Sequence, residues 1–314
     1  MTISPPAPTS TPFPRISVVI PAFNREATIR GAIESVLAQS FTDFEVLVVD
    51  DASTDATVEA VRNVADPRVR LLANPRNMGA GAARNTGLHA ARGDWVAFQD
   101  SDDEWLPRKL ERQMARLDAP GTDWIAAYCG MLVLGTAEAQ GSTPDARPKI
   151  DYLPAQGPHP VEGDLRQALL SVNSISPQTL VARRAVLARI GGFDESLSAV
   201  EDWDLALRLA QEGAIACVDE PLVIQRFSPN SLSRQIARRL AARRAILAKH
   251  HALFAQDPAL LARHHAGHAT LYARLGEHAE AWRALRAALA LRPASPRLWA
   301  RALMLALPRR TIPE

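Results

Sequence analysis

Acidic side chains gather in the short stretch Asp100-Ser101-Asp102-Asp103, directly after the apolar run Trp95–Phe98. Three carboxylates within four residues repel one another unless a cation lies between them. A divalent metal with oxygen ligands resolves this repulsion, often with a phosphate as a further ligand. Asp100 and Asp102 can face one ion, so the stretch predicts a metal site. The alternative is a solvated acidic turn that caps a helix.

The acids follow one of four apolar runs that read as buried strands, at 16–20, 44–49, 69–72 and 95–98. Segments with helical spacing follow them, at 27–39, 58–64, 80–91 and 106–117. Four such units in a row predict a mostly parallel, doubly wound α/β sheet. Ligands of these sheets bind beyond the carboxyl ends of the strands. The polar segments 22–24, 50–55, 77–85 and 100–103 all lie there, so we expect them to converge on one edge.

Further elements are expected in the next part of the chain: strands at 124–134 and 176–182, helices at 184–190 and 201–212, and one or two strands at 216–227. Residues 135–160 are rich in Gly, Pro, Ser and Thr and predict a long loop. A loop of this length is more typical of a lid or a partner-contacting flap than of a simple connector.

Charge divides the 314-residue chain into two parts, although its net charge is only +2. Residues 233–314 hold 15 of the 36 Lys and Arg residues but only 4 of the 34 Asp and Glu residues. We expect a disordered lead-in at 1–14, a main domain at 15–232 and a basic all-α extension at 233–314. Its expected helices are at 233–254, 258–273, 277–291 and 295–307. Residues 273–293 look like one tetratricopeptide-type hairpin, but about three repeats are needed for independent stability, so we expect the extension to pack on the main domain.

Partners and compartment follow less directly from the sequence. The basic extension can face anionic lipid, another polyanion or the acidic main domain, and we expect no nucleic acid partner. The end of the chain, 298–310, is either a membrane-interface helix or an ordinary buried one. Residues 1–14 lack the pattern of a signal peptide, no run of about 18 apolar residues occurs, and Cys129 and Cys217 read as buried structural thiols. We therefore expect a cytoplasmic protein, with the inner face of the membrane as a second option.

Five ordered motifs together resemble family 2 glycosyltransferases, which have the GT-A fold. They are Val-Val-Ile-Pro-Ala-Phe-Asn at 18–24, Val-Val-Asp-Asp-Ala-Ser-Thr-Asp at 48–55, Asn-Met-Gly at 77–79 with Ala-Arg-Asn-Thr-Gly at 83–87, Phe-Gln-Asp-Ser-Asp-Asp at 98–103, and Gly-Gly-Phe-Asp at 191–194 with Glu-Asp-Trp-Asp-Leu at 201–205. The resemblance covers about residues 15–230 and implies a GT-A catalytic domain that binds a nucleotide-diphospho-sugar.

The resemblance also implies roles for single residues. Those expected to bind the nucleotide sugar are Pro21, Phe23, Asn24, Asp51, Gly79, Arg84, Asp100 and Ser101. Pro21 and Phe23 would line the base pocket, where a ring can stack on a nucleobase, and Asp51 would bond the base edge. Core packing for Phe23, a helix cap for Asp51 and a structural ion pair for Arg84 are the competing interpretations. Asp102, with Asp100, would ligate Mn²⁺ or Mg²⁺.

Asp202 would be the catalytic base that removes the acceptor hydroxyl proton during a single inverting displacement. Glu201 would position the sugar or the acceptor, and Trp203 would either stack on an acceptor sugar or pack inward. Many relatives carry a His near residues 226–231, where Phe227 stands here. If Phe227 replaces it, the metal has one protein ligand fewer.

The expected function is therefore an inverting, metal-dependent glycosyl transfer in cell-envelope or exopolysaccharide synthesis, to a glycan, lipid-linked or protein acceptor. A haloacid-dehalogenase-type phosphatase would need its Asp-x-Asp after the first strand, whereas Asp100-Ser101-Asp102 follows the fourth. A sugar nucleotidylyltransferase would need a Gly-rich loop where Pro21-Ala22-Phe23-Asn24 stands. The remaining alternative is a catalytically silent nucleotide-sugar-binding or scaffold protein.

Overall fold

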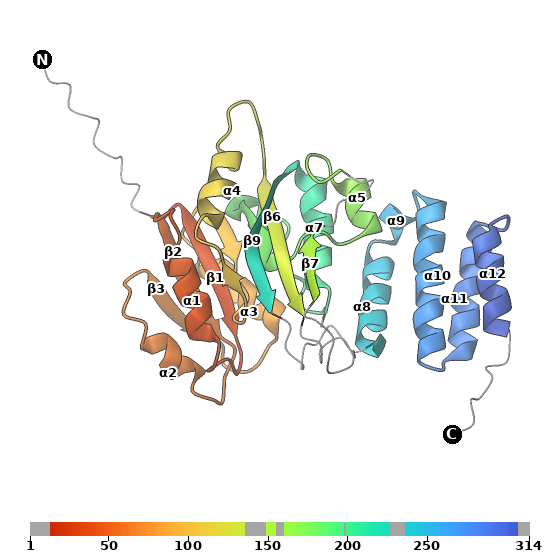
Figure 1. Ribbon diagram of the computed structural model, residues 1–314, viewed down its shortest axis with the longest axis horizontal. Coiled ribbons are helices and arrows are strands. Elements are labelled where there is room, and N and C mark those ends of the chain that lie inside the picture. The colour runs from red at the N-terminus through yellow and green to blue at the C-terminus, as the bar shows by residue number, and fades with distance from the viewer. Residues whose placement is uncertain (1–12, 136–148, 155–159, 198, 227–235, 307–314) are drawn as a thin grey trace, which may run out of the picture.

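The computed structural model describes residues 13–135, 149–154, 160–197, 199–226 and 236–306. Most of the lead-in, most of the long loop and Phe227 lie outside these residues, so the predictions made for them stay predictions. Figure 1 shows a sheet flanked by helices, followed by a row of helices on the side away from β1, β2 and β3.

The first half of the sheet is parallel and consists of β1 (Ile16–Ala22), β2 (Phe44–Asp50), β3 (Val69–Ala73) and β4 (Trp95–Phe98), in the order β3-β2-β1-β4. Every residue of β1, β2 and β4 is buried. Strands covered on both faces are continuously apolar, which is why these runs were readable from the sequence. β1 extends past its predicted end at Ile20 to include Pro21 and Ala22.

Helices cover both faces of this sheet, as alternate residues of β1 show. Val18 and Ile20 lie in one core with residues of α1 (Ile29–Leu37), α2 (Thr57–Arg62) and α4 (Lys109–Leu117). Val19 lies in the opposite core with residues of α3 (Ala80–Ala90) and α7 (Glu201–Glu212). The period of two along a strand therefore places α1 and α3 on different sides.

The second half makes the sheet mixed. β8 (Leu180–Arg183) pairs antiparallel with β4 and with β6 (Ala126–Gly135), and β6 pairs parallel with β9 (Ile215–Arg226). β5 (Glu104–Trp105) pairs with β9, and β7 (Lys149–Leu153) with β6. The prediction of loop throughout 135–160 was therefore wrong at β7. α5 (Arg166–Ser171), a 3₁₀ turn at Pro177–Thr179 and α6 (Arg184–Arg189) complete this part.

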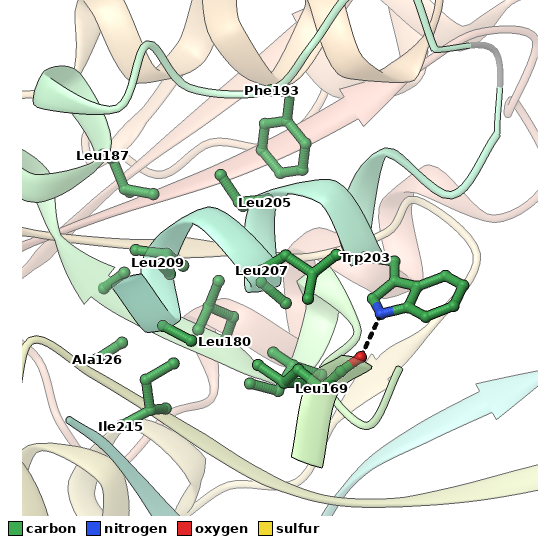
Figure 2. Close-up of a cluster of buried hydrophobic side chains, with 14 of the residues drawn as sticks. Ala126, Leu169, Leu180, Leu187, Phe193, Trp203, Leu205, Leu207, Leu209 and Ile215 are labelled. Atoms are coloured by element: carbon green, nitrogen blue, oxygen red, sulfur yellow. Dashed lines mark hydrogen bonds between the residues drawn. The ribbon is translucent and has the colours of Figure 1, made fainter. Parts of the chain in front are cut away.

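The C-terminal helices are α8 (Ile236–Lys249), α9 (His251–Phe254), α10 (Pro258–Arg274), α11 (His278–Leu291) and α12 (Pro296–Ala306). Ile246, Leu247 and Phe254 belong to the same buried cluster as the leucines of α7, so this extension shares a core with the main domain. Figure 2 shows the α7 part of that cluster, with Leu205, Leu207 and Leu209 facing Phe193, Leu180 and Ile215. No helix among the described residues is long and apolar enough to cross a membrane.

Candidate functional site

The loops after β1 and β2 are bonded to each other through Asn24. This residue has a φ of 52°, a left-handed conformation that asparagine adopts more readily than most residues. Its amide oxygen accepts the N–H of Thr54 at 2.9 Å, and its own N–H donates to Ser53 Oγ at 3.0 Å. The structure therefore gives Asn24 a bracing role, and its contact with a nucleotide stays a prediction.

Asp51 connects the loop after β2 to the loop after β3. Its carboxylate accepts Asn74 Nδ2 at 2.7 Å, the Met78 N–H at 3.0 Å and the Gly79 N–H at 2.8 Å. Gly79 has a φ of 89°, where glycine is favoured, and the chain turns there into α3. Asp51 is only 2% exposed, so it shapes the loop beside the predicted base pocket and its bond to a base stays a prediction.

The N-cap residue of α2 is Ala56, which makes no side-chain cap bond, and the acid next to it is Asp55. Asp55 Oδ1 accepts the N–H of Thr57, the first residue of α2, at 3.0 Å. The competing interpretation of Asp51 as the cap for this helix was therefore wrong.

Arg84 joins acids from two distant motifs. It lies in α3, is 5% exposed, and donates from Nη2 to Asp100 Oδ1 at 2.7 Å and from Nη1 to Glu201 Oε1 at 2.9 Å. Burial alone would lower the pKa of Arg84, but Asp100 and Glu201 raise it above its ordinary value. A permanent cation thus holds the end of β4 next to the start of α7.

The acids after β4 lie close enough to one another to raise the pKa values of Asp102 and Asp103. Arg25 Nε lies 3.7 Å from Asp102 Oδ2, and burial and Asp100 raise the pKa of Asp102. Asp103 is 4% exposed, its Oδ2 has no hydrogen-bond partner among the described residues, and burial raises its pKa to about 9. This set of oxygen donors fits a hard divalent cation, whose charge would favour the ionised carboxylates.

The protein ligands alone do not complete such a site. Within the described residues, no group of three or more His, Cys, Asp or Glu side chains is arranged to hold a metal. Asp102 and Asp100 would thus need oxygen ligands from a diphosphate or water, as Mg²⁺ sites commonly use.

Asp202 lies in the first turn of α7, after Val200, whose φ of 58° is unusual for a β-branched residue. Its Oδ1 accepts the N–H of Trp203 at 2.7 Å, and its Oδ2 accepts Asn173 Nδ2 at 2.8 Å. Burial and the charge of Glu201 raise the pKa of Asp202 to about 6, against the opposing effects of these bonds and of Arg84. Such a carboxylate is ionised at neutral pH and more basic than an ordinary one, which suits a general base.

Trp203 packs inward. Its indole N–H donates to the carbonyl oxygen of Leu169 at 2.7 Å, and the residue is 6% exposed. Figure 2 shows this bond between α7 and α5. The structure therefore favours the inward packing of Trp203, and its contact with an acceptor sugar stays a prediction.

Three further predicted residues differ in their access to a ligand. Phe23 is 40% exposed and directly follows β1. It is therefore not part of the core, and its ring is accessible for stacking on a base. Pro21 is buried within β1, and Ser101 is 6% exposed between Asp100 and Asp102.

Two residues that contact these acids were not predicted from the sequence. Arg25 follows the motif at 18–24 directly, and its position beside Asn24 was the available signal. Asn173 follows α5 and had no signal, because a single polar residue gives no spacing pattern and its partner Asp202 is 29 positions away.

Comparison with known proteins places this site in a family. Residues 17–131 match the family described as "Glycosyl transferase family 2". An uncharacterized glycosyltransferase of Haemophilus influenzae is 30% identical over 218 residues, which is 68% of each chain. The chain belongs to glycosyltransferase family 2. The motifs at 18–24, 48–55, 77–87 and 98–103 lie within the matched residues.

Other relatives of this family 2 chain match over shorter stretches. The succinoglycan biosynthesis protein ExoO of Rhizobium meliloti is 50% identical over 108 residues, 34% of this chain and 31% of that protein. The Escherichia coli UDP-Glc:alpha-D-GlcNAc-diphosphoundecaprenol beta-1,3-glucosyltransferase WfgD is 44% identical over 102 residues, 32% of this chain and 40% of that protein. The alignment thus spans about a third of the length of ExoO.

Solved structures share the fold of this family 2 chain over almost its whole length. Staphylococcus aureus TarS 1–349 in complex with UDP has a TM-score of 0.63 at 22% identity. The alignment covers 93% of this chain and 88% of the TarS chain. The mannosyltransferase PcManGT of Pyrobaculum calidifontis, in complex with GDP-Man and Mn²⁺, has a TM-score of 0.59 at 24% identity. The alignment covers 97% of this chain and 83% of the PcManGT chain. These GT-A neighbours agree with the fold class expected from the sequence.

Proposed function

We propose that the protein is an inverting, metal-dependent glycosyltransferase that moves a sugar from a nucleotide-diphospho-sugar to an acceptor hydroxyl. The observation that carries this proposal is the double ion pair of Arg84, which brings Asp100 next to Glu201, the neighbour of Asp202. An acid suited to metal binding and an acid suited to proton removal thereby share one edge of the sheet.

Asp202 is the base of the proposed reaction. Its carboxylate takes the proton of the acceptor hydroxyl while that oxygen attacks the anomeric carbon and the bond to the diphosphate breaks. Asn173 holds Oδ2 and the α7 backbone holds Oδ1, so the carboxylate has a fixed direction before the substrate arrives. Attack on the face opposite the leaving group inverts the anomeric configuration.

The donor side of the site uses Phe23, Arg84, Asp100 and Asp102. Phe23 offers an exposed ring for the base, and Asp102 with Asp100 would hold a divalent cation, Mn²⁺ or Mg²⁺. Such an ion, when bound, stabilises the negative charge of the departing diphosphate. The bound Mn²⁺ and GDP-Man of PcManGT support this assignment.

The relatives suggest the pathway and the acceptor. ExoO is named for succinoglycan biosynthesis, and WfgD for transfer to a diphosphoundecaprenol-linked sugar. We therefore place the reaction in polysaccharide biosynthesis, with a lipid-linked glycan as the favoured acceptor.

We further propose that α12 contacts the surface of an anionic membrane. The helix buries Leu298 and Ala302 but leaves Trp299 58%, Leu303 65% and Met304 65% exposed. Exposed arginines, Arg297 and Arg301, lie on the same helix. Apolar side chains, one of them Trp, beside arginines suit a bilayer interface with anionic headgroups.

The replacement Asp202→Asn tests the catalytic assignment. It keeps the size of the side chain but removes the base, so we expect transfer to be abolished while binding of the nucleoside diphosphate survives. Asp94→Asn is the matched control, because Asp94 is exposed before β4, at the other end of that strand. Loss of nucleotide binding together with transfer would make Asp202 structural, and full transfer by Asp202→Asn would refute its role as base.

A further inference from the structure

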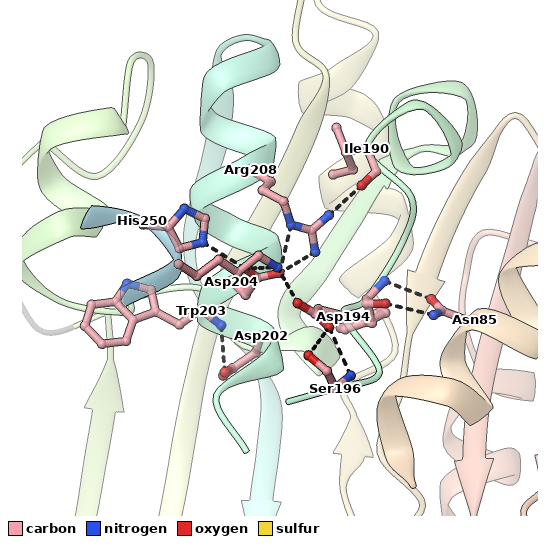
Figure 3. A network of polar contacts seen from close by, with 11 residues as sticks. Asn85, Ile190, Asp194, Ser196, Asp202, Trp203, Asp204, Arg208 and His250 are labelled. Carbon is pink, nitrogen blue, oxygen red and sulfur yellow. Dashed lines mark hydrogen bonds and ion pairs between the residues drawn. The ribbon is translucent and has the colours of Figure 1, made fainter. Parts of the chain in front are cut away.

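The helix that carries Asp202 is bonded to the C-terminal extension through Asp204. Asp204 is fully buried and pairs with Arg208 of its own helix at 2.6 Å, with Lys249 Nζ at 2.7 Å and with His250 Nε2 at 2.8 Å. Burial alone would raise the pKa of Asp204, but bonds to His250, Lys249 and Arg208 hold it well below its usual range. Figure 3 shows Arg208 and His250 reaching Asp204 from different elements.

Lys249 also reaches the segment that leads into α7. Its Nζ lies 2.5 Å from Asp194 Oδ2, and the preceding residue, Phe193, donates its N–H to Asn85 Oδ1 at 2.8 Å. Asn85 follows Arg84 in α3. Lys249, the last residue of α8, therefore connects Asp194 to Asp204. Asp194 lies next to Phe193, which is bonded to the helix that carries Arg84.

The extension contacts α7 a second time, around Trp203. The ring centroid of Phe254 lies 6.3 Å from that of Trp203, and the centroid of His264 lies 5.9 Å from it. His264 Nε2 lies 2.8 Å from the carbonyl oxygen of Leu170, which can only accept, so Nε2 carries the hydrogen. Trp203 bonds Leu169 in the same turn of α5, and Asn173, the partner of Asp202, follows two residues after this helix.

The geometry points to Lys249 and His250 as positioning residues for the catalytic base. Through Asp204 they fix the first turn of α7, and this sets the direction and burial of the Asp202 carboxylate. The extension is then part of the catalytic apparatus and not a separate module. The catalytic consequence rests on the function proposed above, whereas the structural consequence can be measured without turnover.

The variants Lys249→Met and His250→Leu each remove one partner of Asp204 with little change in side-chain volume. We expect kcat to fall about a hundred-fold, as for a displaced catalytic group, with little change in the donor KM. The acidic limb of the pH profile should move from about 6 toward the ordinary range of Asp, because a released Asp202 is less buried. Lys249→Arg, which keeps the cation, should retain most of the activity, and Arg274→Met, at an exposed arginine of α10, is the charge-matched control.

An unchanged kcat and pH limb in both variants would overturn the inference, as would equal losses in kcat and donor affinity. A single variant can fail to fold because it leaves a buried anion short of partners. The double variant Asp204→Asn with Lys249→Met removes that charge and should have a kcat no lower than Lys249→Met alone. If the loss of kcat in the double variant equals the product of the losses in Asp204→Asn and Lys249→Met, the two residues act separately, and this result would contradict the inference.

Hydrogen exchange of the amides at 201–206 tests the same contact without substrate. We expect faster exchange there in Lys249→Met and unchanged exchange in β1, β2 and β4. Equal exchange in α7 would overturn the positioning role. If the wild-type chain turns over no sugar nucleotide, the proposed function fails, while the exchange measurement still decides whether the extension holds α7.

Discussion

Asp202 combines two properties, a fixed direction of its carboxylate and a raised pKa. Asn173 and the Trp203 N–H fix both carboxylate oxygens, while burial and Glu201 disfavour its ionised form. The first effect orients the base and the second strengthens it. Since bonds to the ionised form lower a pKa, the desolvation and the repulsion must be the larger influences here.

The pH profile of transfer should report this environment. Asp202 must be ionised to accept a proton, and its folded-state pKa is about 6. We therefore expect kcat/KM to be flat above this value and to fall about ten-fold per unit of pH below it. Initial rates with saturating metal across pH 4.5 to 8 measure the limb. A profile that stays flat down to the ordinary pKa of Asp, about 4, would contradict the raised pKa.

Arg84 should contribute to stability as well as to the site. Arg84→Met leaves Asp100 and Glu201 without their buried cation, and breaking a buried pair in this way costs about 3–5 kcal/mol. The free energy of unfolding in urea measures the loss. Arg166→Met breaks the exposed pair with Asp164 and should leave the free energy of unfolding nearly unchanged. Equal small losses in the two variants would show that Arg84 is not structurally important.

The acids of the site and Arg84 could be predicted from the sequence, but Asn173 and Lys249 could not. Asp100, Asp102 and Asp202 stand in short motifs whose charge pattern is visible along the chain. Asn173 and Lys249 are single polar residues that reach the site only through the packing of α5 and α8. The same packing buried Trp203, which the motif alone could not reveal.

At the scale of elements, α3 lies unusually close to β1. A Cβ added at Gly87 would lie 2.3 Å from Val19 Cγ1, so only glycine fits this contact without a shift. The small residues of the 80–91 segment predicted this close packing. The short distance between α3 and β1 also sets how far Arg84, which lies in α3, stands from the sheet.

Gly87→Ala should therefore destabilise the fold by about 1–3 kcal/mol through overpacking. Val19→Ala should recover part of this loss in the double variant, because it removes the contacting methyl groups. Gly31→Ala is the control: a Cβ at this exposed glycine of α1 would meet no described atom within 4 Å, so it should stabilise the helix by about 0.5–1 kcal/mol. Denaturant midpoints measure all three, and a neutral Gly87→Ala would contradict the close approach.

Continuously apolar or strongly periodic elements could be predicted from the sequence, and elements without such a pattern could not. β4 and α7 have the predicted bounds, because the polar Gln99 ends the apolar run of β4 and Gly213 follows the last residue of α7. β5 has two residues and β7 lies in a stretch rich in Gly and Pro, so neither shows a strand period. β5 pairs with β9, which is distant in sequence, and β7 pairs with β6, the strand that precedes it in the chain.

At the scale of the molecule, the exposed face of α12 should bind anionic vesicles. Cosedimentation with vesicles rich in phosphatidylglycerol should exceed that with phosphatidylcholine, and it should weaken with salt as the arginine contribution is screened. Trp299→Gln with Leu303→Gln should reduce binding without affecting the fold, since both side chains are exposed. Concentration-dependent dimerisation without vesicle binding would show instead that a second copy covers this face.

The most direct test of the whole account is thermal unfolding with a panel of nucleoside diphosphates, with and without Mn²⁺. A ligand that binds the native state raises the melting temperature. We predict stabilisation that requires both the metal and one particular base, and its loss in Asp102→Ala. Stabilisation that survives in Asp102→Ala would refute the ligand assignment. The absence of stabilisation by any nucleotide would contradict the transferase site and favour a catalytically silent protein.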